Sequence, residues 1–216
     1  MERIAGAMEL HPVALRDISE VETWEREYNK QVASGIWLSC GVAGKFANIK
    51  LEDLDEVQRD LAGRFLAKIE KNKGAALWLC GKPGTGKSAL AAAIARKICD
   101  QGKRVMFLKS HMLTDSIQTK RKTLKEVENS IKGNALVVFE ECGRYPLAQW
   151  ESYYLFELVD FLYGENTNVI LTTNQAKTEF GAFVGSACMD RFKGIAESYE
   201  FTGESYRGKE NELYVR

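Results

Sequence analysis

The chain has 216 residues, of which 45% are hydrophobic and 28% are charged, a composition that predicts a folded domain with room for a short extension. Thirty basic residues balance thirty acidic ones. This balance excludes a uniformly basic nucleic-acid coat protein, although it allows a local basic patch.

No run approaches the ~18 apolar residues of a membrane span, and the first residues lack the features of a signal peptide. The five cysteines are scattered without a C-x-x-C pair, and only two histidines are present, which argues against a zinc site. An odd number of cysteines in apolar surroundings indicates reduced thiols. We therefore expect a cytoplasmic protein without a membrane partner.

Residues 1–48 are expected to form a short helical extension that precedes a domain over residues 49–216. A Ser-x-x-Glu capping box predicts a helix over residues 19–33, and residues 41–50 are typical of a loop. We predict that this extension binds a partner protein through its aromatic and apolar residues; the alternative is that these residues pack on the domain. These residues are Trp24, Tyr28, Ile36 and Trp37.

The domain is predicted to begin with a helix within residues 51–74, because apolar residues recur there at three- and four-residue steps. These residues are Leu54, Val57, Leu61, Phe65 and Ile69. Strands are predicted next at 76–80, 104–108, 134–139, 168–174 and, more weakly, 198–203. Helices are predicted between them at 88–102, within 110–132 and at 149–164, the last with Tyr154, Leu158, Phe161 and Leu162 on one face. Apolar strands that alternate with helices predict an α/β fold, a parallel sheet with helices on both faces.

The sequence GKPGTGKS, residues 81–88, matches G-x-x-x-x-G-K-[ST] and lies between a predicted strand and a predicted helix, the context in which the pattern indicates a P-loop. Its glycines let backbone N–H groups surround a polyphosphate at a helix N-terminus. Lys87 can reach the β- and γ-phosphates, and the Ser88 hydroxyl can ligate Mg²⁺. The residues expected to hold ATP are Gly81, Pro83, Gly84, Thr85, Gly86, Lys87, Ser88 and Ala89.

Two adjacent carboxylates, Glu140 and Glu141, stand at the end of the apolar strand ALVVF. Two like charges there repel each other and lose water, so a positive charge must oppose them. In P-loop proteins such a strand ends in an acidic residue that holds Mg²⁺, usually through water. We expect Glu140 to face the metal and Glu141 to orient or deprotonate the attacking water.

The strand at 168–174 ends in the sequence LTTN. Asn174 would place an amide near the γ-phosphate and the water, although Asn at the end of a strand is also common in turns. Together with the P-loop and the acidic pair, Asn174 is predicted to belong to the catalytic site.

Three strands that end in a P-loop, an acidic pair and Asn resemble the layout of AAA+ ATPases. The later sequences MDR and SYR, with FEECGRY and LTTNQ before them, resemble bacterial replicative helicase loaders of the DnaC/DnaI type and the related IstB transposition helpers. The resemblance covers residues 42–209. It implies an AAA+ ATPase core with a P-loop.

Carried over to this sequence, the resemblance implies that Arg191 is an arginine finger that reaches the γ-phosphate held by a neighbouring subunit. It implies that Arg207 contacts the nucleotide of its own chain. It also implies an ATP-dependent homo-oligomer and a hexameric replicative DNA helicase as the partner, placed on single-stranded DNA.

The chain departs from the family at three points. Glu140 stands where relatives generally have Asp, and the additional methylene moves the carboxylate by roughly 1.5 Å, which predicts slow hydrolysis. The N-terminal part lacks the cysteine cluster that some loaders use for zinc. Only a short tail follows the last predicted strand, so a full helical lid is not expected. The compact size suggests a phage or mobile-element protein.

The segment between the second and third strands is locally basic, and in similar loaders this region contacts single-stranded DNA. Its basic residues are Lys109, Lys120, Arg121, Lys122 and Lys125. Because aromatic residues are missing from this segment, DNA binding would depend on charge rather than on base stacking. A solvated helix face is the alternative interpretation.

Four functions are compatible with the sequence. The first is an ATP-dependent helicase loader, and the second is a transposition helper ATPase that acts on a transposase. The third is a nucleotide-gated adaptor that binds ATP and barely hydrolyses it, an alternative that depends on Glu140. A small-molecule kinase fits least, because the motifs that contain Arg191 and Arg207 argue against it.

Overall fold

The computed structural model describes residues 31, 34–35, 37–42, 44–71, 74–110, 119, 123–143, 149–176, 178–179, 185–186, 190–191 and 196–206, with only the backbone for 149–156. The helices with described bounds are η1 (Gly44–Phe46), η2 (Leu51–Asp53), α2 (Glu56–Lys71), α3 (Lys87–Cys99), α5 (Leu124–Ile131) and α6 (Gln149–Gly164). The strands are β1 (Ala76–Gly81), β2 (Val105–Lys109), β3 (Leu136–Cys142), β4 (Asn168–Thr173) and β5 (Ala196–Phe201).

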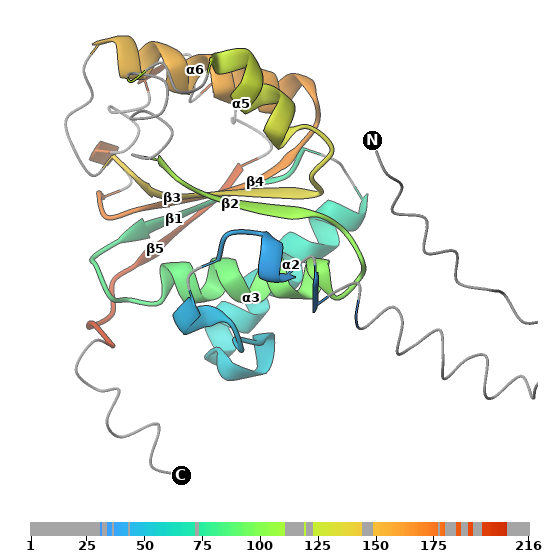
Figure 1. The fold of residues 1–216 in the computed structure, drawn as a ribbon. Helices are drawn as coiled ribbons and strands as arrows, with labels where there is room; N and C mark the ends of the chain where they lie inside the picture. The colour runs from blue at the N-terminus through green and yellow to red at the C-terminus, as the bar shows by residue number, and fades with distance from the viewer. Residues whose placement is uncertain are drawn as a thin grey trace, which may run out of the picture.

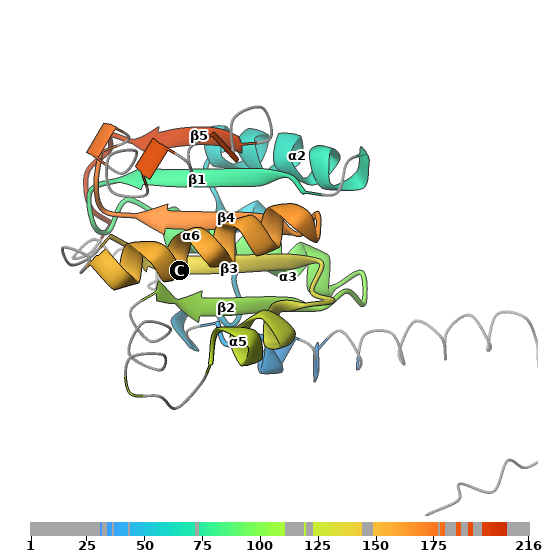
Figure 2. The ribbon, with the colours of Figure 1, turned by 90° about the horizontal axis from the view of Figure 1, so that it is seen from above.

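The five strands form one parallel sheet in the order β2-β3-β4-β1-β5. Figure 1 shows the sheet between two layers, with α5 and α6 on one face and α2 and α3 on the other. Figure 2 shows the strands side by side in the same order. The predicted α/β fold with helices on both faces of a parallel sheet is thereby confirmed.

Alternating side chains of each strand feed two separate cores, as the period of two in a strand requires. On β1, Leu77 and Leu79 pack toward α2 and α3, whereas Ala76 and Trp78 pack toward α6. Because both faces are covered, the strands consist of continuous apolar runs rather than alternating ones. In the described part of the chain, no helix has the length and apolar character needed to cross a membrane.

The predicted elements of the domain are present, with differences at some boundaries. Strand β3 continues through both glutamates to Cys142 rather than ending at residue 139, and β5 begins at Ala196, two residues before its predicted start. The predicted helix over 19–33 lies outside the described residues except for Gln31.

The apolar face of α2 differs from its predicted composition at one position. Leu61 and Phe65 are fully buried, as expected, but Val57 is 56% exposed. The α-helix begins only at Glu56, so Leu54 lies before it and does not set the helical phase. Gln58 takes the buried position in the first turn instead and is only 6% exposed.

The end of the N-terminal extension packs on the domain. Trp37 is 3% exposed; its indole N–H donates to the carbonyl oxygen of Ala47 at 2.7 Å, and its ring faces the Arg96 guanidinium of α3. The Cys40 carbonyl accepts the N–H of Phe107, in the edge strand β2, at 2.7 Å. Trp37 is therefore a core residue, so packing on the domain, the alternative interpretation, holds for this residue, and partner binding by the extension stays a prediction. Trp24, Tyr28 and Ile36 lie outside the described residues, and the division of the chain near residue 48 stays a prediction.

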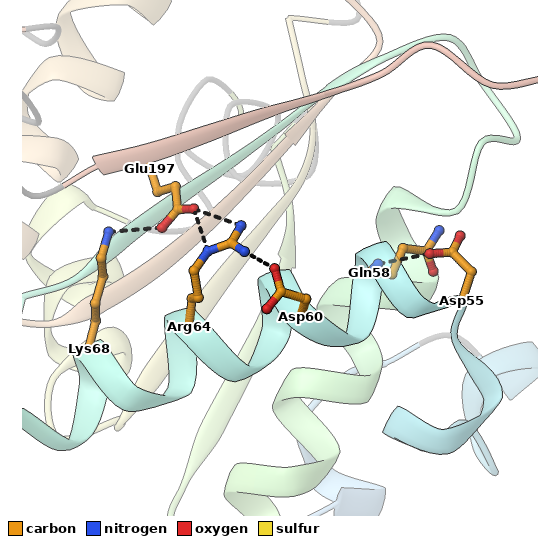
Figure 3. A network of polar contacts seen from close by, with 6 residues as sticks. All are labelled: Asp55, Gln58, Asp60, Arg64, Lys68 and Glu197. Atoms are coloured by element: carbon orange, nitrogen blue, oxygen red, sulfur yellow. Dashed lines mark hydrogen bonds and ion pairs between the residues drawn. The ribbon is translucent and has the colours of Figure 1, made fainter.

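Helix α2 is tied to the edge strand β5 by a charged network (Figure 3). Glu197 of β5 accepts from Lys68 at 2.9 Å and from Arg64 at 3.2 Å, and Arg64 also pairs with Asp60. Burial by itself would raise the pKa of Glu197, but the charges and hydrogen bonds of Lys68 and Arg64 outweigh burial and hold that pKa below its usual range. The network therefore ties α2 to the edge strand β5.

Replacing Glu197 with Gln is expected to lower the free energy of unfolding at pH 7 by up to about 1 kcal/mol, since the paired cations are half exposed. Because the pKa of Glu197 is lower in the folded state, its carboxylate stabilises the fold at pH values above the pKa of the unfolded state. This stabilisation is lost as the pH falls through the pKa of the folded state. Urea denaturation should therefore show a difference between wild type and Glu197→Gln at pH 7 that disappears at acid pH. Glu200→Gln, at an exposed site on the same strand, is the control, and an equal effect of both changes would contradict the prediction.

Candidate functional site

The strand order brings three sequence motifs to one edge of the sheet. In a parallel sheet all carboxyl ends lie at the same edge, and ligands of α/β proteins bind there. The P-loop follows β1, the glutamate pair ends β3, and Asn174 follows β4 directly. Strand β4 lies between β1 and β3. The backbone of Asn174, directly after β4, therefore lies between the strand end that carries the P-loop and the strand end that carries the two glutamates.

The P-loop wraps tightly because its glycines adopt conformations that other residues avoid. Gly81, Gly84 and Gly86 have φ angles of +123°, +83° and +100°, in the region that only glycine enters readily. Gly86 is the N-cap of α3, so the loop leads directly into a helix N-terminus that favours an anion. Among the remaining loop residues, Pro83 is exposed, and Ser88 and Ala89 are half-buried in the first turn of α3.

Lys87 is held inside the loop by backbone carbonyl groups. Its Nζ donates to the carbonyl oxygens of Gly81 and Lys82, both at 2.6 Å, and lies 3.5 Å from Thr85 Oγ1. The side chain is 7% exposed. A buried ammonium at a helix N-terminus concentrates positive charge at the position where the sequence predicts phosphate binding.

Glu140 is a buried carboxylate, 8% exposed, on the face of β3 that packs toward α3. None of the ion pairs found in the described residues includes Glu140. Its neighbour Cys142 is completely buried, and this burial together with the Glu140 charge raises the pKa of the Cys142 thiol to about 12. A buried carboxylate of this kind needs a compensating cation. The Glu140 carboxylate and the Ser88 hydroxyl are oxygen ligands of the kind that Mg²⁺ prefers. The glycine-rich P-loop fits a polyphosphate.

Glu141 has an unusual backbone conformation, with φ +58°, which residues other than glycine adopt infrequently. Its N–H donates to Thr172 Oγ1 of β4 at 3.1 Å. Glu141 is half-buried and Asn174 is exposed, so polar groups of β3 and β4 meet at the edge beside the P-loop.

The segment after β5 also contacts the P-loop, a contact that the sequence motifs do not reveal. The backbone N–H of Tyr206 donates to the Gly84 carbonyl oxygen at 2.9 Å. Gln58 of α2 approaches the same loop, with its Nε2 only 2.9 Å from the position where a Cβ on Gly86 would stand. Arg207 lies outside the described residues, but the residue directly before it is hydrogen-bonded to the phosphate loop.

Arg191 lies on the side of the sheet covered by α6. Its Nε donates to Asp160 Oδ1 of α6 at 2.6 Å. This hydrogen bond and the Asp160 charge raise the pKa of the guanidinium. Arg191 therefore has a partner within its own chain, Asp160, a contact that no sequence motif marks.

The predicted DNA-binding residues are only partly described. Lys109 is exposed at the end of β2 and pairs in register with Glu140. Lys125 on α5 is exposed and forms an ion pair with Glu128 of the same helix at 3.5 Å. The central residues of this set, Lys120, Arg121 and Lys122, lie outside the described residues.

The chain is a P-loop protein of the AAA+ class. Its sheet has the strand order of that class, with the P-loop after β1, acidic residues at the end of β3 and polar residues at the end of β4. The family model described as IstB-like ATP binding protein matches residues 46–213. The chain belongs to this family.

Individual relatives come from insertion sequences and from DNA replication. A protein of insertion sequence IS21 from Pseudomonas aeruginosa, named as an ATP-binding protein, is 31% identical over 163 residues, 72% of this chain and 59% of the relative. The chain thus spans little more than half of that protein. The replicative helicase loader DnaC of Escherichia coli K12 is 24% identical over 207 residues, 93% of this chain and 82% of the relative.

Solved structures show the same fold at low sequence identity. A crystal structure of the DnaC helicase loader has a TM-score of 0.64 at 17% identity and covers 74% of this chain and 100% of its own. The crystal structure of DnaI also has a TM-score of 0.64, at 20% identity, and covers 76% of this chain and 94% of its own.

Gly81→Ala is expected to destabilise the domain by about 3 kcal/mol or more, since overpacking and backbone strain each cost about 1–3 kcal/mol. A Cβ at Gly81 would stand 2.3 Å from the Phe201 carbonyl oxygen of β5, a backbone atom that cannot move aside. Gly102→Ala is the matched control, because its φ is +72° but no atom lies within 4 Å of its Cβ position. Chemical denaturation should show a clearly smaller loss for Gly102→Ala, and equal losses would contradict the prediction.

Proposed function

We propose that this protein is an ATP-dependent helicase loader, an AAA+ ATPase that binds a hexameric replicative helicase and helps to place it on single-stranded DNA. The observation that supports an ATPase is the meeting of a cationic P-loop, a buried carboxylate and a second carboxylate at one edge of the sheet. Similarity to DnaC over 93% of this chain and 82% of the relative supports the loader role.

In this proposal, Lys87 binds the β- and γ-phosphates, and Ser88 and Glu140 hold Mg²⁺, partly through water. Bound Mg²⁺ would neutralise phosphate charge and compensate the buried Glu140. Glu141 orients or deprotonates the attacking water, and the Asn174 amide lies beside that water. The additional methylene of Glu140 predicts slow turnover, since a misplacement of about 1 Å can cost ~10² in rate.

ATP is proposed to assemble several copies of this chain. Arg191 would then reach the phosphates of a neighbouring subunit, and Arg207 would contact the nucleotide of its own chain. The hydrogen bond from Tyr206 to Gly84 supports the second role, because it fixes the residue before Arg207 to the P-loop. Lys109, Lys120, Arg121, Lys122 and Lys125 are proposed to contact DNA phosphates, with binding that weakens as salt increases.

A second candidate function is that of a transposition helper ATPase. The match to the IstB-like family over residues 46–213 and the 31% identity to the IS21 protein favour it. The two functions share the nucleotide site and differ in the partner, which would be a transposase instead of a helicase.

Lys87→Ala is expected to weaken Mg·ATP binding by at least about ten-fold, because it removes a charge-assisted contact to phosphate. Lys97→Ala, at an exposed site on the same helix, is the control and should bind normally. Calorimetry measures both, and wild type that gives no heat with Mg·ATP would refute the proposal. Co-elution with ATP then separates the two candidate functions: a hexameric helicase as partner supports the loader, and a transposase supports the helper.

Arg191→Ala is expected to lower ATP hydrolysis by ~10³ or more if Arg191 is an arginine finger. Because the finger would act across a subunit boundary, mixing Arg191→Ala with Lys87→Ala subunits should restore part of the hydrolysis. Each variant contributes the residue that the other lacks. A mixture of Lys87→Ala with Glu141→Gln is the control, since both residues serve the nucleotide of their own subunit. No gain in the first mixture, with each variant still able to assemble, would contradict action in trans.

A further inference from the structure

The pairing of β3 with β4 contains one additional residue at the glutamate pair. Phe139 pairs with Leu171 and Cys142 pairs with Thr173, so two residues of β3 lie opposite one residue of β4. This is a β-bulge, a feature that redirects side chains and often lies near active sites. Phe139 and Cys142 both pack in the core toward α6. The bulge therefore interrupts the normal alternation of faces between these two residues.

The bulge sets the backbone conformation at Glu141 and thereby the direction of its side chain. In a regular strand, Glu140 and Glu141 would point to opposite faces of the sheet. Here Glu141 instead has a φ of +58°, a conformation that persists in a non-glycine residue only when its surroundings hold it. The direction of its carboxylate consequently depends on contacts that keep the bulge in place.

Side chains at the end of β4 hold the bulge on both sides. Thr172, which is 2% exposed, accepts the N–H of Glu141 through Oγ1 at 3.1 Å. Gln175 donates through Nε2 to the carbonyl oxygen of Gly143 at 3.1 Å. The N–H of Gln175 donates to Thr173 Oγ1 at 3.2 Å, which fixes the start of the Gln175 side chain. Hydrogen bonds therefore hold the chain both at Glu141 and two residues after it.

The close approach of Gln175 requires glycine at position 143. Gly143 has a φ of +76°, and a Cβ there would stand 2.8 Å from Gln175 Oε1 and 3.0 Å from its Cδ. A larger residue would push the amide away from the backbone that it binds. The glycine after the acidic pair thus permits the contact of β4 with the end of β3.

We propose that Thr172 and Gln175 are positioning residues that hold the β3 bulge and thereby aim the Glu141 carboxylate. The inference rests on the proposed hydrolytic role of Glu141. Asn174 lies in the chain between Thr172 and Gln175, so the amide proposed to contact the attacking water and the carboxylate that activates it are fixed to the same short segment. Neither positioning residue touches the reacting atoms in this role.

Thr172→Val tests the first contact, because it keeps the shape of the side chain and removes the acceptor for the Glu141 N–H. We expect kcat for ATP hydrolysis to fall by at least about ten-fold, with KM and the affinity for Mg·ATP within about two-fold of wild type. Thr172→Ser should recover most of the rate, because it restores the hydroxyl. Thr167→Val is the matched control, since Thr167 is also buried but lies before the start of β4.

A second measurement does not depend on hydrolysis. In Thr172→Val, amide hydrogen exchange of the Glu141 N–H, followed by NMR without nucleotide, should be faster by at least about ten-fold, because the amide loses its acceptor. Exchange in the centre of β1 should stay unchanged. Gln175→Leu should increase exchange in residues 141–143 and lower kcat in the same direction as Thr172→Val.

The outcomes separate the two proposals. Unchanged exchange at Glu141 in Thr172→Val, or an unchanged kcat in a protein whose wild type hydrolyses ATP, overturns the positioning role. The positioning role is also overturned if Thr172→Val loses affinity for Mg·ATP as much as it loses kcat, or if Thr167→Val loses kcat equally. Either result would indicate general damage to the fold. Wild type that neither binds nor hydrolyses ATP overturns the proposed function instead, and with it the catalytic reason for the positioning.

Discussion

The strand order β2-β3-β4-β1-β5 is the constraint on which the candidate site depends, because it fixes the neighbours of the phosphate loop. All five strands are parallel, so every carboxyl end lies at one edge. Strand β1 delivers the P-loop there with β4 on one side and β5 on the other. The candidate polar groups lie at the ends of β3 and β4, and the segment after β5, with Tyr206, supports the loop from the opposite side.

The same edge contains the groups that are least favourable for stability. Glu140 is a buried carboxylate, and Glu141 has a backbone conformation that non-glycine residues rarely adopt. In the sequence, both glutamates come just after the fully buried part of β3, where Leu136, Val137 and Val138 have no exposed surface. A rigid apolar strand can hold an unfavourable end in place, because fluctuations that would relieve the strain would also disturb the core on both faces.

The sequence predicted the fold class and most elements because their signals are local. Continuous apolar runs between helices indicate buried parallel strands, and the P-loop pattern indicates its own strand–loop–helix context. Features that depend on contacts between distant segments were not predictable. Trp37 could be an exposed or a core residue until its contacts with Ala47 and Arg96 were known. Val57 is exposed because the buried face of α2 is centred on Gln58, Leu61, Ala62 and Phe65, and Val57 lies beside it.

The candidate site shows the same limit more sharply. Lys87, Glu140 and Asn174 were predictable as candidates because their side chains belong to recognisable patterns. The bulge at Glu141 is a property of the register between two strands, and neither strand's sequence specifies it alone. The Tyr206 contact uses a backbone N–H, which every residue except proline has, so no side-chain pattern marks it.

The pairing of Arg191 with Asp160 bears on how a finger residue could serve another subunit. The hydrogen bond between the two side chains lies at an exposed site, where ion pairs are weakened by water and salt. If Arg191 acts as proposed, exchanging Asp160 for a more strongly charged polyphosphate would therefore cost little. A weak partner within the chain is in this way compatible with a stronger one across a subunit boundary.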